Sequence, residues 1–211
     1  MHKKVVIVDY GLGNLFSIQQ ACIHLGYMPI LSSDPEQILK CDSLILPGVG
    51  SFEIAIRQLG QFNLIEPIRL FAKSGKPIMG VCLGMQLLFD ISYEFGDHKG
   101  LGLISGEVLK FPKTVNGNVI RIPHIGWNKI YKNQLNWEQS PLGSLINESL
   151  MYFVHSYYVK PSNSSNILTT TNYSNFEFCS SVVKDNIFGF QFHPEKSGLD
   201  GLMIYNNFLK N

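Results

Sequence analysis

The chain contains 211 residues, of which 45% are hydrophobic and 16% are charged. This length suffices for one substantial core, and the composition differs from the low-hydrophobicity, high-charge composition that keeps chains disordered. Seventeen basic residues against sixteen acidic ones leave a formal net charge of +1, so the charge indicates neither a nucleic-acid partner nor an anionic membrane. We therefore expect a single domain over residues 1–211 that acts on a small substrate.

The hydrophobic runs predict neither a membrane span nor a secretory signal. The longest run, Pro77–Phe89, is interrupted by glycines and is too short to cross a bilayer. The early run Val5–Val8 is too short for the apolar part of a secretory signal. We therefore expect a cytoplasmic protein without disulfides. The cysteines show no C-x-x-C spacing, so we expect no metal site. They are Cys22, Cys41, Cys82 and Cys179.

The first half of the chain alternates short β-branched runs with amphipathic stretches. This alternation predicts parallel strands joined by crossover helices. The helix that begins at Leu15 is expected to end at Gly26, and the helix through Leu70 at Gly75, because glycine adopts the left-handed cap without strain. The expected elements run over Val5–Val8, Leu15–Leu25, Pro29–Leu31, Ser43–Leu46, Leu64–Ala72 and Pro77–Val81.

The second half is a series of strand-like runs separated by turn signals. Asn116-Gly117 and Asp185-Asn186 have the composition of tight turns, and Pro161–Asn166 is a polar loop. A last amphipathic stretch, Leu199–Leu209, is expected to pack as a helix on the sheet. The two halves together predict an α/β fold with a mostly parallel central sheet and an added antiparallel or mixed region. The strand-like runs are Glu107–Phe111, Val119–Ile122, Trp127–Tyr131, Met151–Val154, Ile167–Tyr173, Phe176–Val183 and Ile187–Phe192.

The segment Lys76–Phe89 has the form of a nucleophile elbow. An apolar strand leads into Gly80-Val81-Cys82-Leu83-Gly84, and a helical run follows. Small residues two positions before and after the central residue allow the sharp turn that exposes its side chain at the carboxyl edge of the sheet. The helix N-terminus favours the thiolate of Cys82, which is the nucleophilic form. The alternative is a buried structural cysteine.

A second segment, Phe188–Gly198, ends a strand in His193-Pro194-Glu195. Proline restricts His193 to extended geometry, and in an extended chain residues i and i+2 point the same way. The carboxylate of Glu195 then orients the imidazole, which takes the thiol proton and later protonates the leaving ammonia. The alternative is that the tripeptide simply ends a strand with polar residues.

Two glycine-rich turns follow apolar strands. Gly48-Val49-Gly50 can point backbone amides at an anion, and acyl transfer through a thioester develops negative charge on the carbonyl oxygen. It is therefore a candidate oxyanion loop, with an ordinary glycine-rich turn as the alternative. Gly11-Leu12-Gly13-Asn14 has Phe16 where a dinucleotide fingerprint carries its third glycine, so we expect neither a nicotinamide nor any other cofactor.

The motifs G-V-C-L-G-M-Q, P-G-V-G and Q-F-H-P-E-K-S-G together resemble those of the triad-type (class I) glutamine amidotransferases. More narrowly, Asp9–Asn14, Gly100–Ile104, Pro123–Asn128 and Phe153–Tyr158 resemble the glutaminase subunit of imidazole glycerol phosphate synthase, and the match runs nearly end to end. The resemblance implies a flavodoxin-like, three-layer fold and hydrolysis of L-glutamine to glutamate and ammonia. It also implies a heterodimer in which a (β/α)₈-barrel synthase subunit receives the ammonia.

The resemblance assigns further roles by position. Gln86 lies one helical turn after Cys82 and can face the same pocket, while Glu94 carries a charge suited to the substrate α-amino group. His155 lies in an aromatic strand without a nearby carboxylate, so we expect a structural histidine there rather than the base. The implied oxyanion donors are Gly48, Val49, Gly50 and Leu83. The implied substrate-binding residues are Gln86, Glu94, His155, Ser156 and Tyr157. The implied partner interface contains Asn14, Pro123, Gly126, Trp127 and Lys196.

Three functions remain open from the sequence. The first is the histidine-pathway glutaminase, whose partner makes imidazole glycerol phosphate and an aminoimidazole carboxamide ribotide. The second is a paralogous glutaminase that supplies ammonia for amidino sugars of bacterial surface polysaccharides. Arg121-Ile122 and Tyr93 depart from the expected pattern and bear on this choice of partner. The third is a noncatalytic binding protein on the same fold, against which the joint presence of cysteine, histidine and glutamate argues.

Overall fold

The computed structural model describes residues 3–210, and its main feature is a mixed sheet of twelve strands. The strand order is β2-β1-β3-β4-β16-β15-β13-β7-β5-β6. In addition, β14 pairs with β15, and β11 pairs with β14. The run β2-β1-β3-β4-β16 is parallel throughout, whereas β16-β15-β13-β7 is antiparallel. The strands are β1 (Val5–Val8), β2 (Ile30–Ser32), β3 (Ser43–Leu46), β4 (Ile78–Val81), β5 (Phe89–Ser92), β6 (His98–Lys99), β7 (Ile104–Lys110), β11 (Tyr131–Lys132), β13 (Tyr157–Pro161), β14 (Ile167–Tyr173), β15 (Phe176–Lys184) and β16 (Ile187–Phe190).

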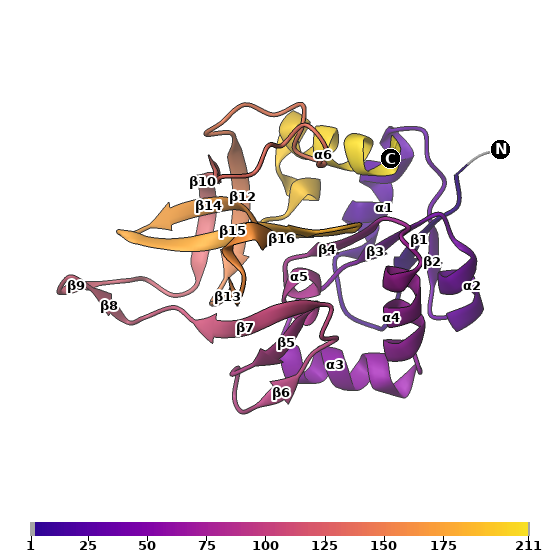
Figure 1. The fold of residues 1–211 in the computed structure, drawn as a ribbon, viewed down its shortest axis with the longest axis horizontal. Helices are drawn as coiled ribbons and strands as arrows, with labels where there is room; N and C mark the ends of the chain where they lie inside the picture. Colours follow the sequence, from indigo (N-terminus) through magenta and orange to yellow (C-terminus); the bar gives the residue numbers. More distant parts are fainter. Residues whose placement is uncertain (1–2, 211) are drawn as a thin grey trace.

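Helices cover both faces of the parallel part, which gives three layers. Figure 1 shows the sheet between α6 on one side and α3 and α4 on the other. The helices are α1 (Leu15–His24), α2 (Pro35–Lys40), α3 (Phe52–Gln61), α4 (Ile65–Lys73), α5 (Leu83–Leu87) and α6 (Gly198–Lys210). The flavodoxin-like α/β fold expected from the sequence is therefore confirmed at the level of architecture. None of the helices formed by residues 3–210 has the length and apolar character that crossing a bilayer requires.

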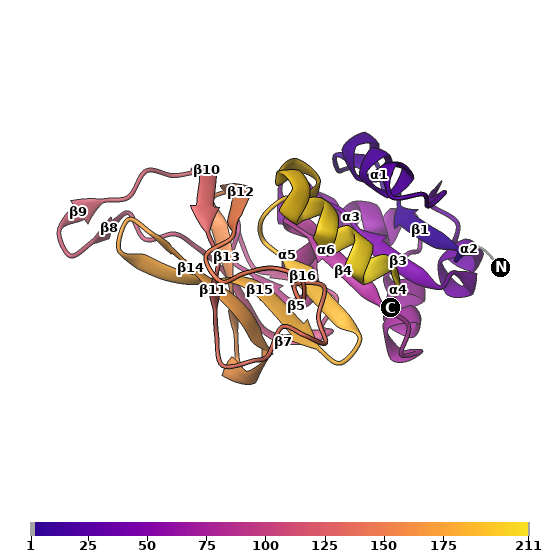
Figure 2. The same ribbon diagram turned by 90° about the horizontal axis from the view of Figure 1, so that it is seen from above.

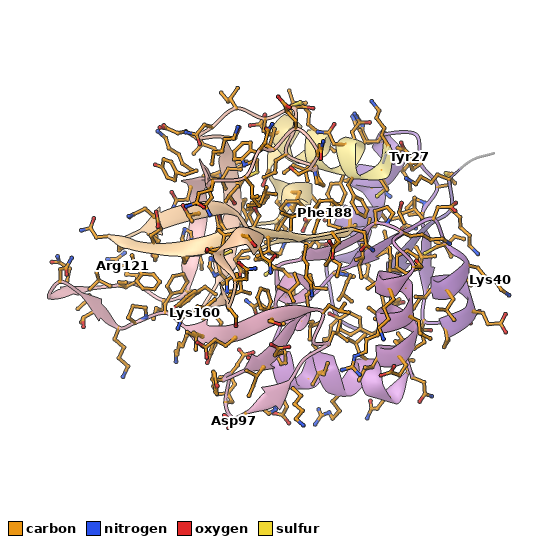
Figure 3. All side chains as sticks on the ribbon, viewed as in Figure 1. Tyr27, Lys40, Asp97, Arg121, Lys160 and Phe188 are labelled. Carbon is orange, nitrogen blue, oxygen red and sulfur yellow. The ribbon has the colours of Figure 1, made fainter. Side chains whose placement is uncertain are left out.

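The central strands are hydrophobic on both faces because helices cover both faces of the sheet. Side chains alternate between the two faces along each strand. Val6 and Val8 of β1 join the core under α2, α3 and α4, whereas Val5 and Ile7 join the core under α1 and α6. All four side chains are fully buried. Such a continuous apolar run is typical of a parallel strand covered by helices. Figure 3 shows side chains filling the space between these layers, with Phe188 of β16 in the interior.

The antiparallel part extends away from both chain termini (Figure 2). A two-stranded sheet of β10 (His124–Lys129) and β12 (Leu150–His155) lies beside the main sheet. The hairpin of β8 (Thr114–Val115) and β9 (Asn118–Val119) projects beyond it. Its two turn residues, Asn116 and Gly117, both have positive φ, at 51° and 82°. This is the backbone that an Asn-Gly hairpin turn requires, so the predicted turn is confirmed.

The structure contains elements that were not expected, and some expected elements have other bounds. Helices α2 and α3 and strands β5, β6 and β13 were not predicted. The start of α2 carries a readable signal, because Asp34 accepts a hydrogen bond from Glu36 N at 2.9 Å and Pro35 occupies the first turn. The helical run expected through Phe89 is wrong at its end, since α5 stops at Leu87 and β5 begins at Phe89. Of the strand expected at 119–122, only Val119 lies in a strand.

Candidate active site

Strand order brings three sequence motifs to one edge of the sheet. Strand β16 lies parallel to β4, with Phe190 in register with Val81, and β3 lies on the other side of β4. The carboxyl ends of parallel neighbours meet at the same edge. The segments that follow these strands therefore come together. They carry Gly48-Val49-Gly50 after β3, Cys82 after β4 and His193 after β16.

Cys82 occupies a sharp turn between β4 and α5. Its backbone has φ 54° and ψ −111°, a strained conformation for a residue with a side chain. The turn is held because Cys82 N donates to Phe190 O at 2.7 Å. A Cβ on Gly80 would lie 2.7 Å from Gly84 O, and a Cβ on Gly84 would overlap Leu46 O. The two flanking glycines are therefore required by close backbone approach, as the elbow motif predicts.

The thiol of Cys82 differs from the other three in its surroundings. All four cysteines are free and buried, but among them only Cys82 lines the pocket described below. Burial raises the pKa of Cys22 to about 12 and that of Cys41 to about 11, and it also raises the pKa of Cys179. These three thiols are thus held in the protonated, unreactive form. The Sγ of Cys82 lies 3.9 Å from Val154 O and 3.7 Å from Gln191 Nε2.

His193 and Glu195 form a buried pair beside this thiol. Their Nδ1 and Oε1 atoms are 2.8 Å apart, and the side chains are 2% and 0% exposed. The carboxylate therefore accepts from Nδ1–H and leaves Nε2 as the atom available to the thiol. Nε2 makes no hydrogen bond of good geometry within residues 3–210. Burial alone lowers the pKa of His193, but Cys82 and Glu195 outweigh this effect and raise the pKa.

The local backbone of this pair differs from the expected one. His193 is extended, with φ −102° and ψ 95°, as expected before proline. The chain does not stay extended, however, because residues Pro194–Lys196 form a 3₁₀ turn. The carboxylate reaches the imidazole from this turn. Tyr205 of α6 lies behind it, with its hydroxyl 3.5 Å from Glu195 Oε2.

Strand β12 and Ser197 hold the histidine in place, and sequence reasoning missed both contacts. His193 N donates to Tyr152 O at 2.9 Å. Ser197 Oγ donates to His193 O at 2.7 Å and accepts from Tyr152 N at 3.0 Å. The backbone of His193 is thus fixed to β12, which is remote in sequence. Nothing in the H-P-E motif signals this anchoring, since it depends on which strand lies alongside.

These groups open into a pocket of about 420 Å³, a volume suited to a small ligand. Each substrate-binding residue expected from the sequence lines it, as do three of the four expected oxyanion residues. The lining residues are Val49, Gly50, Cys82, Leu83, Gln86, Glu94, Pro123, Val154, His155, Ser156, Tyr157 and His193. Gly48 lies behind this surface, where a Cβ would be 2.8 Å from Gly84 N and so would collide with the elbow.

The two polar side chains on the floor of the pocket are already oriented by the protein. Gln86 Nε2 donates to Tyr157 O and to Gln191 Oε1, both at 3.1 Å. The carbonyl oxygen of Gln86 has no hydrogen-bond partner among residues 3–210 and remains available to a ligand N–H. Glu94 accepts from Phe52 N at 2.6 Å, and burial raises the pKa of its carboxyl group. The pocket therefore offers acceptors for an amide and an amine.

His155 also lines the pocket but has a different environment. Its Nδ1 donates to Tyr157 O at 2.8 Å, and its Nε2 lies 3.1 Å from Nδ1 of His124. Burial lowers the pKa of His155 to about 3 and that of His124 to about 4. Both rings are therefore neutral at physiological pH. His155 lacks the carboxylate that accompanies His193, as the sequence led us to expect.

Of the expected interface residues, Pro123 lines the pocket, and Trp127 and Lys196 lie against Tyr152. The side chain of Trp127 is 55% exposed, as suits an interface residue. The Trp127 ring meets the Tyr152 ring edge to face, with centroids 6.0 Å apart. Lys196 Nζ lies 5.9 Å from the centroid of the same tyrosine. Gly126 precedes Trp127 in β10, and Asn14 lies half-buried before α1.

The profile of the family "Glutamine amidotransferase class-I" matches residues 6–211, and the chain belongs to that family. It is accordingly a glutamine amidotransferase enzyme. Solved structures of low identity share the fold: PurLQS from Thermotoga maritima has a TM-score of 0.74 at 19% identity, with 100% of this chain and 99% of that chain covered. A structure described as a glutamine amidotransferase gives 0.73 at 15% identity, with 97% of each chain covered.

Closer relatives carry a narrower name. The chain is 47% identical to imidazole glycerol phosphate synthase subunit HisH 1 of Legionella pneumophila (strain Lens), with 98% of each chain covered. It is 44% identical to the HisH subunit of Sulfurimonas denitrificans, covering 98% of this chain and 97% of the relative. The HisH subunit of Aquifex aeolicus is 43% identical, with 97% and 95% covered. Within the class, the chain therefore groups with the HisH subunits.

Proposed function

We propose that this chain is the glutaminase subunit of imidazole glycerol phosphate synthase, and that Cys82, His193 and Glu195 are its catalytic triad. The observation that carries the proposal is that the elbow of Cys82 lies beside the His193–Glu195 pair at the wall of one pocket. Nδ1 of His193 and Oε1 of Glu195 are 2.8 Å apart. Nucleophile, base and orienting carboxylate in this arrangement define covalent acyl transfer. A noncatalytic binding protein would not require a strained cysteine beside a buried histidine–glutamate pair.

The reaction begins when glutamine binds with its side-chain amide against Cys82. His193 Nε2 takes the thiol proton, and Sγ attacks the amide carbon. The oxygen of that amide becomes an oxyanion, for which the amides of Gly48-Val49-Gly50 and Leu83 are the candidate donors. Collapse of the intermediate breaks the C–N bond, and the proton on His193 passes to the departing nitrogen as ammonia is released. A glutamyl thioester remains on Cys82.

Hydrolysis of the thioester reverses the role of the same base. His193 takes a proton from water, whose oxygen attacks the thioester carbon, and the thiolate leaves as glutamate forms. The proton then returns to the sulfur. Glu195 stabilises the imidazolium in both halves of the cycle because its Oε1 accepts from Nδ1–H. Gln86 Oε1 and Glu94 line the pocket and are placed to receive the amide and α-amino groups of the substrate.

The names of the relatives support the histidine pathway over the amidino-sugar alternative. We propose a cytoplasmic heterodimer in which a (β/α)₈-barrel subunit takes up the ammonia to form imidazole glycerol phosphate and aminoimidazole carboxamide ribotide. The exposed Trp127, the neighbouring Lys196 and Asn14, with Pro123 at the pocket mouth, are the candidate contacts. Docking there gives ammonia a route that avoids bulk water. We also propose that residues 1–211 form one domain, since strands of both halves share one sheet.

An electrophilic glutamine analogue tests the site directly. It should modify Cys82 alone, as read by mass spectrometry of the digested protein, and Cys82→Ala should prevent the modification. Cys22→Ala, Cys41→Ala and Cys179→Ala are matched controls that should leave both labelling and glutaminase activity in place. An adduct on any cysteine other than Cys82 would overturn the assignment.

A further inference from the structure

A buried amide pair connects the candidate nucleophile to the floor of the pocket. Gln191 follows Phe190, which is in register with Val81, so Gln191 comes to lie beside Cys82. Its side chain is fully buried, and its Nε2 lies 3.7 Å from Cys82 Sγ. Its backbone N donates to Ser180 O at 2.9 Å, which fixes its position in the sheet. The polar side chain thus has a defined place against the sulfur.

The hydrogen bonds of Gln86 determine which end of the Gln191 amide faces the sulfur. Gln86 Nε2 donates one hydrogen to Tyr157 O and the other to Gln191 Oε1. The oxygen of Gln191 is therefore occupied as an acceptor, and its NH₂ group points to Sγ. A flipped Gln191 would set two NH₂ groups against each other and a carbonyl oxygen against the sulfur. The first contact is unfavourable in a buried site and the second is unfavourable to a thiolate, which can only accept, so the orientation is determined.

This arrangement matters most once the thiol has lost its proton. The neutral thiol lies 3.9 Å from Val154 O, which can only accept a hydrogen bond. A thiolate loses that contact and needs donors, and Gln191 Nε2 is the uncharged donor already beside it. Hydrogen bonds to an ionised partner are shorter and roughly twice as strong as neutral ones. The donor therefore favours the thiolate and also selects the rotamer of Cys82.

We propose that Gln191 stabilises and orients the Cys82 thiolate, and that Gln86 acts through Gln191 as a positioning residue in addition to its place in the pocket. This inference rests on the proposed role of Cys82 as nucleophile. A purely structural role for Gln191 makes a different prediction. Loss of its hydrogen bonds would then lower thermal stability but would leave the ionisation of Cys82 unchanged.

The test is the pH profile of Cys82 alkylation by iodoacetamide in the absence of glutamine. Gln191→Met removes the amide at similar volume. Its alkylation midpoint should rise by about one pH unit, which makes the reaction about tenfold slower below the midpoint. Gln61→Met, at the exposed end of α3, is the matched control and should follow the wild-type profile. Superimposed profiles for Gln191→Met and wild type would overturn the inference.

A second variant protects the test against misfolding. If Gln191→Met fails to fold by circular dichroism, Gln86→Met removes the donor that orients Gln191 and should shift the midpoint in the same direction by a smaller amount. An unshifted profile in that folded variant would also overturn the inference. Peptide mapping separates this result from failure of the proposed function. Alkylation of wild-type protein away from Cys82 contradicts the nucleophile, whereas an unshifted profile at Cys82 contradicts only the role of Gln191.

Discussion

His193 and His155 line the same pocket and are both buried, yet their environments shift their pKa values in opposite directions. His193 has Glu195 Oε1 at 2.8 Å and Cys82 alongside, and these neighbours raise its pKa. His155 has a backbone carbonyl and the neutral ring of His124, and burial lowers its pKa to about 3. Burial disfavours the charged ring in both cases, so the partner decides which histidine can carry a proton.

The two histidines also belong to different parts of the sheet. His193 follows β16, in the parallel part, where strand ends place loops and strained turns at one edge. His155 ends β12 in the antiparallel part, within an aromatic layer that includes Phe111 and Phe178. The parallel edge therefore supplies reactive groups, and the antiparallel part supplies a rigid apolar wall. Each of the following experiments challenges this division, beginning with the largest expected effect.

Replacing either member of the proposed nucleophile–base pair should abolish glutamine hydrolysis. We expect Cys82→Ala and His193→Ala to lower kcat by roughly 10⁴-fold or more each, and the double variant to be no worse than the single ones, because the groups act as a unit. Steady-state glutaminase assays measure this. His155→Ala is the paired comparison and should cost much less. Equal loss of thioester formation in His155→Ala, with Cys82 intact, would show that the base is misassigned.

Removing the charge of the orienting carboxylate should have a smaller effect. Glu195→Gln keeps the size of the side chain but no longer favours imidazolium, so kcat should fall by roughly 10²- to 10⁴-fold, within the range of general acid–base catalysis. The pKa of His193 should also fall, and ¹⁵N NMR titration of the imidazole reads this directly. A titration identical to that of wild type would contradict the electrostatic role of Glu195.

The lowered pKa of His124 and the raised pKa of His193 predict that stability depends on pH in opposite ways through these two residues. His124 is neutral in the fold down to about pH 4, whereas its unfolded form gains a proton near pH 6.5. Stability should therefore fall between pH 6.5 and pH 4, by about 3 kcal/mol from His124 alone. The raised pKa of His193 acts the other way, since its contribution is complete below pH 6.5 and is lost as the pH rises toward about 10.

Urea unfolding at successive pH values measures these slopes. His124→Phe keeps a ring for stacking on Tyr173, whose centroid is 4.0 Å away. This variant should reduce the slope on the acid side of the profile and leave the alkaline side unchanged. Glu195→Gln should do the reverse. His155, whose pKa is also lowered, keeps its own share of the acid slope in the His124→Phe variant. An acid slope identical to that of wild type in His124→Phe would show that His124 does not contribute.

The smallest effect is expected at the exposed aromatic residue Trp127 of β10. Trp127→Ala should weaken binding of the proposed synthase subunit by about 2 kcal/mol, since exposed tryptophans are common interface anchors. The basal activity of the isolated chain should stay the same, because Trp127 is 55% exposed and does not line the pocket. Titration with the synthase subunit while glutaminase turnover is followed measures both quantities.

The same titration tests whether the partner controls catalysis. We expect the isolated chain to hydrolyse glutamine slowly and the complex with an acceptor-substrate analogue to be much faster, because docking sets the Gly48-Val49-Gly50 amides toward the oxyanion. Val49 is 40% exposed, and Gly50 has a positive φ of 100°, so this loop is open to a docking partner. Full activity in the isolated chain, unchanged by the partner, would contradict partner control.

Local backbone chemistry makes the motifs of the proposed triad recognisable in the sequence. Gly80 and Gly84 indicate the elbow because a side chain at either position would collide with neighbouring backbone. Proline after His193 restricts that residue to extended geometry, which the structure retains. The alternation of apolar runs and helices likewise predicted the parallel part of the sheet. The effect of proline and the apolar alternation depend on residues close in sequence, whereas the glycines can be recognised because no other residue type fits so close to the neighbouring backbone.

Tertiary structure decided which remote groups complete the site. The pairing of β16 with β4 places Gln191 beside Cys82. The position of β12 supplies the carbonyl of Tyr152 that holds His193. Phe89 has a helix-compatible sequence context, but it begins strand β5 because β5 pairs with β7. Such contacts join residues many positions apart, and the periodicity of one segment carries no information about the strand that will lie next to it.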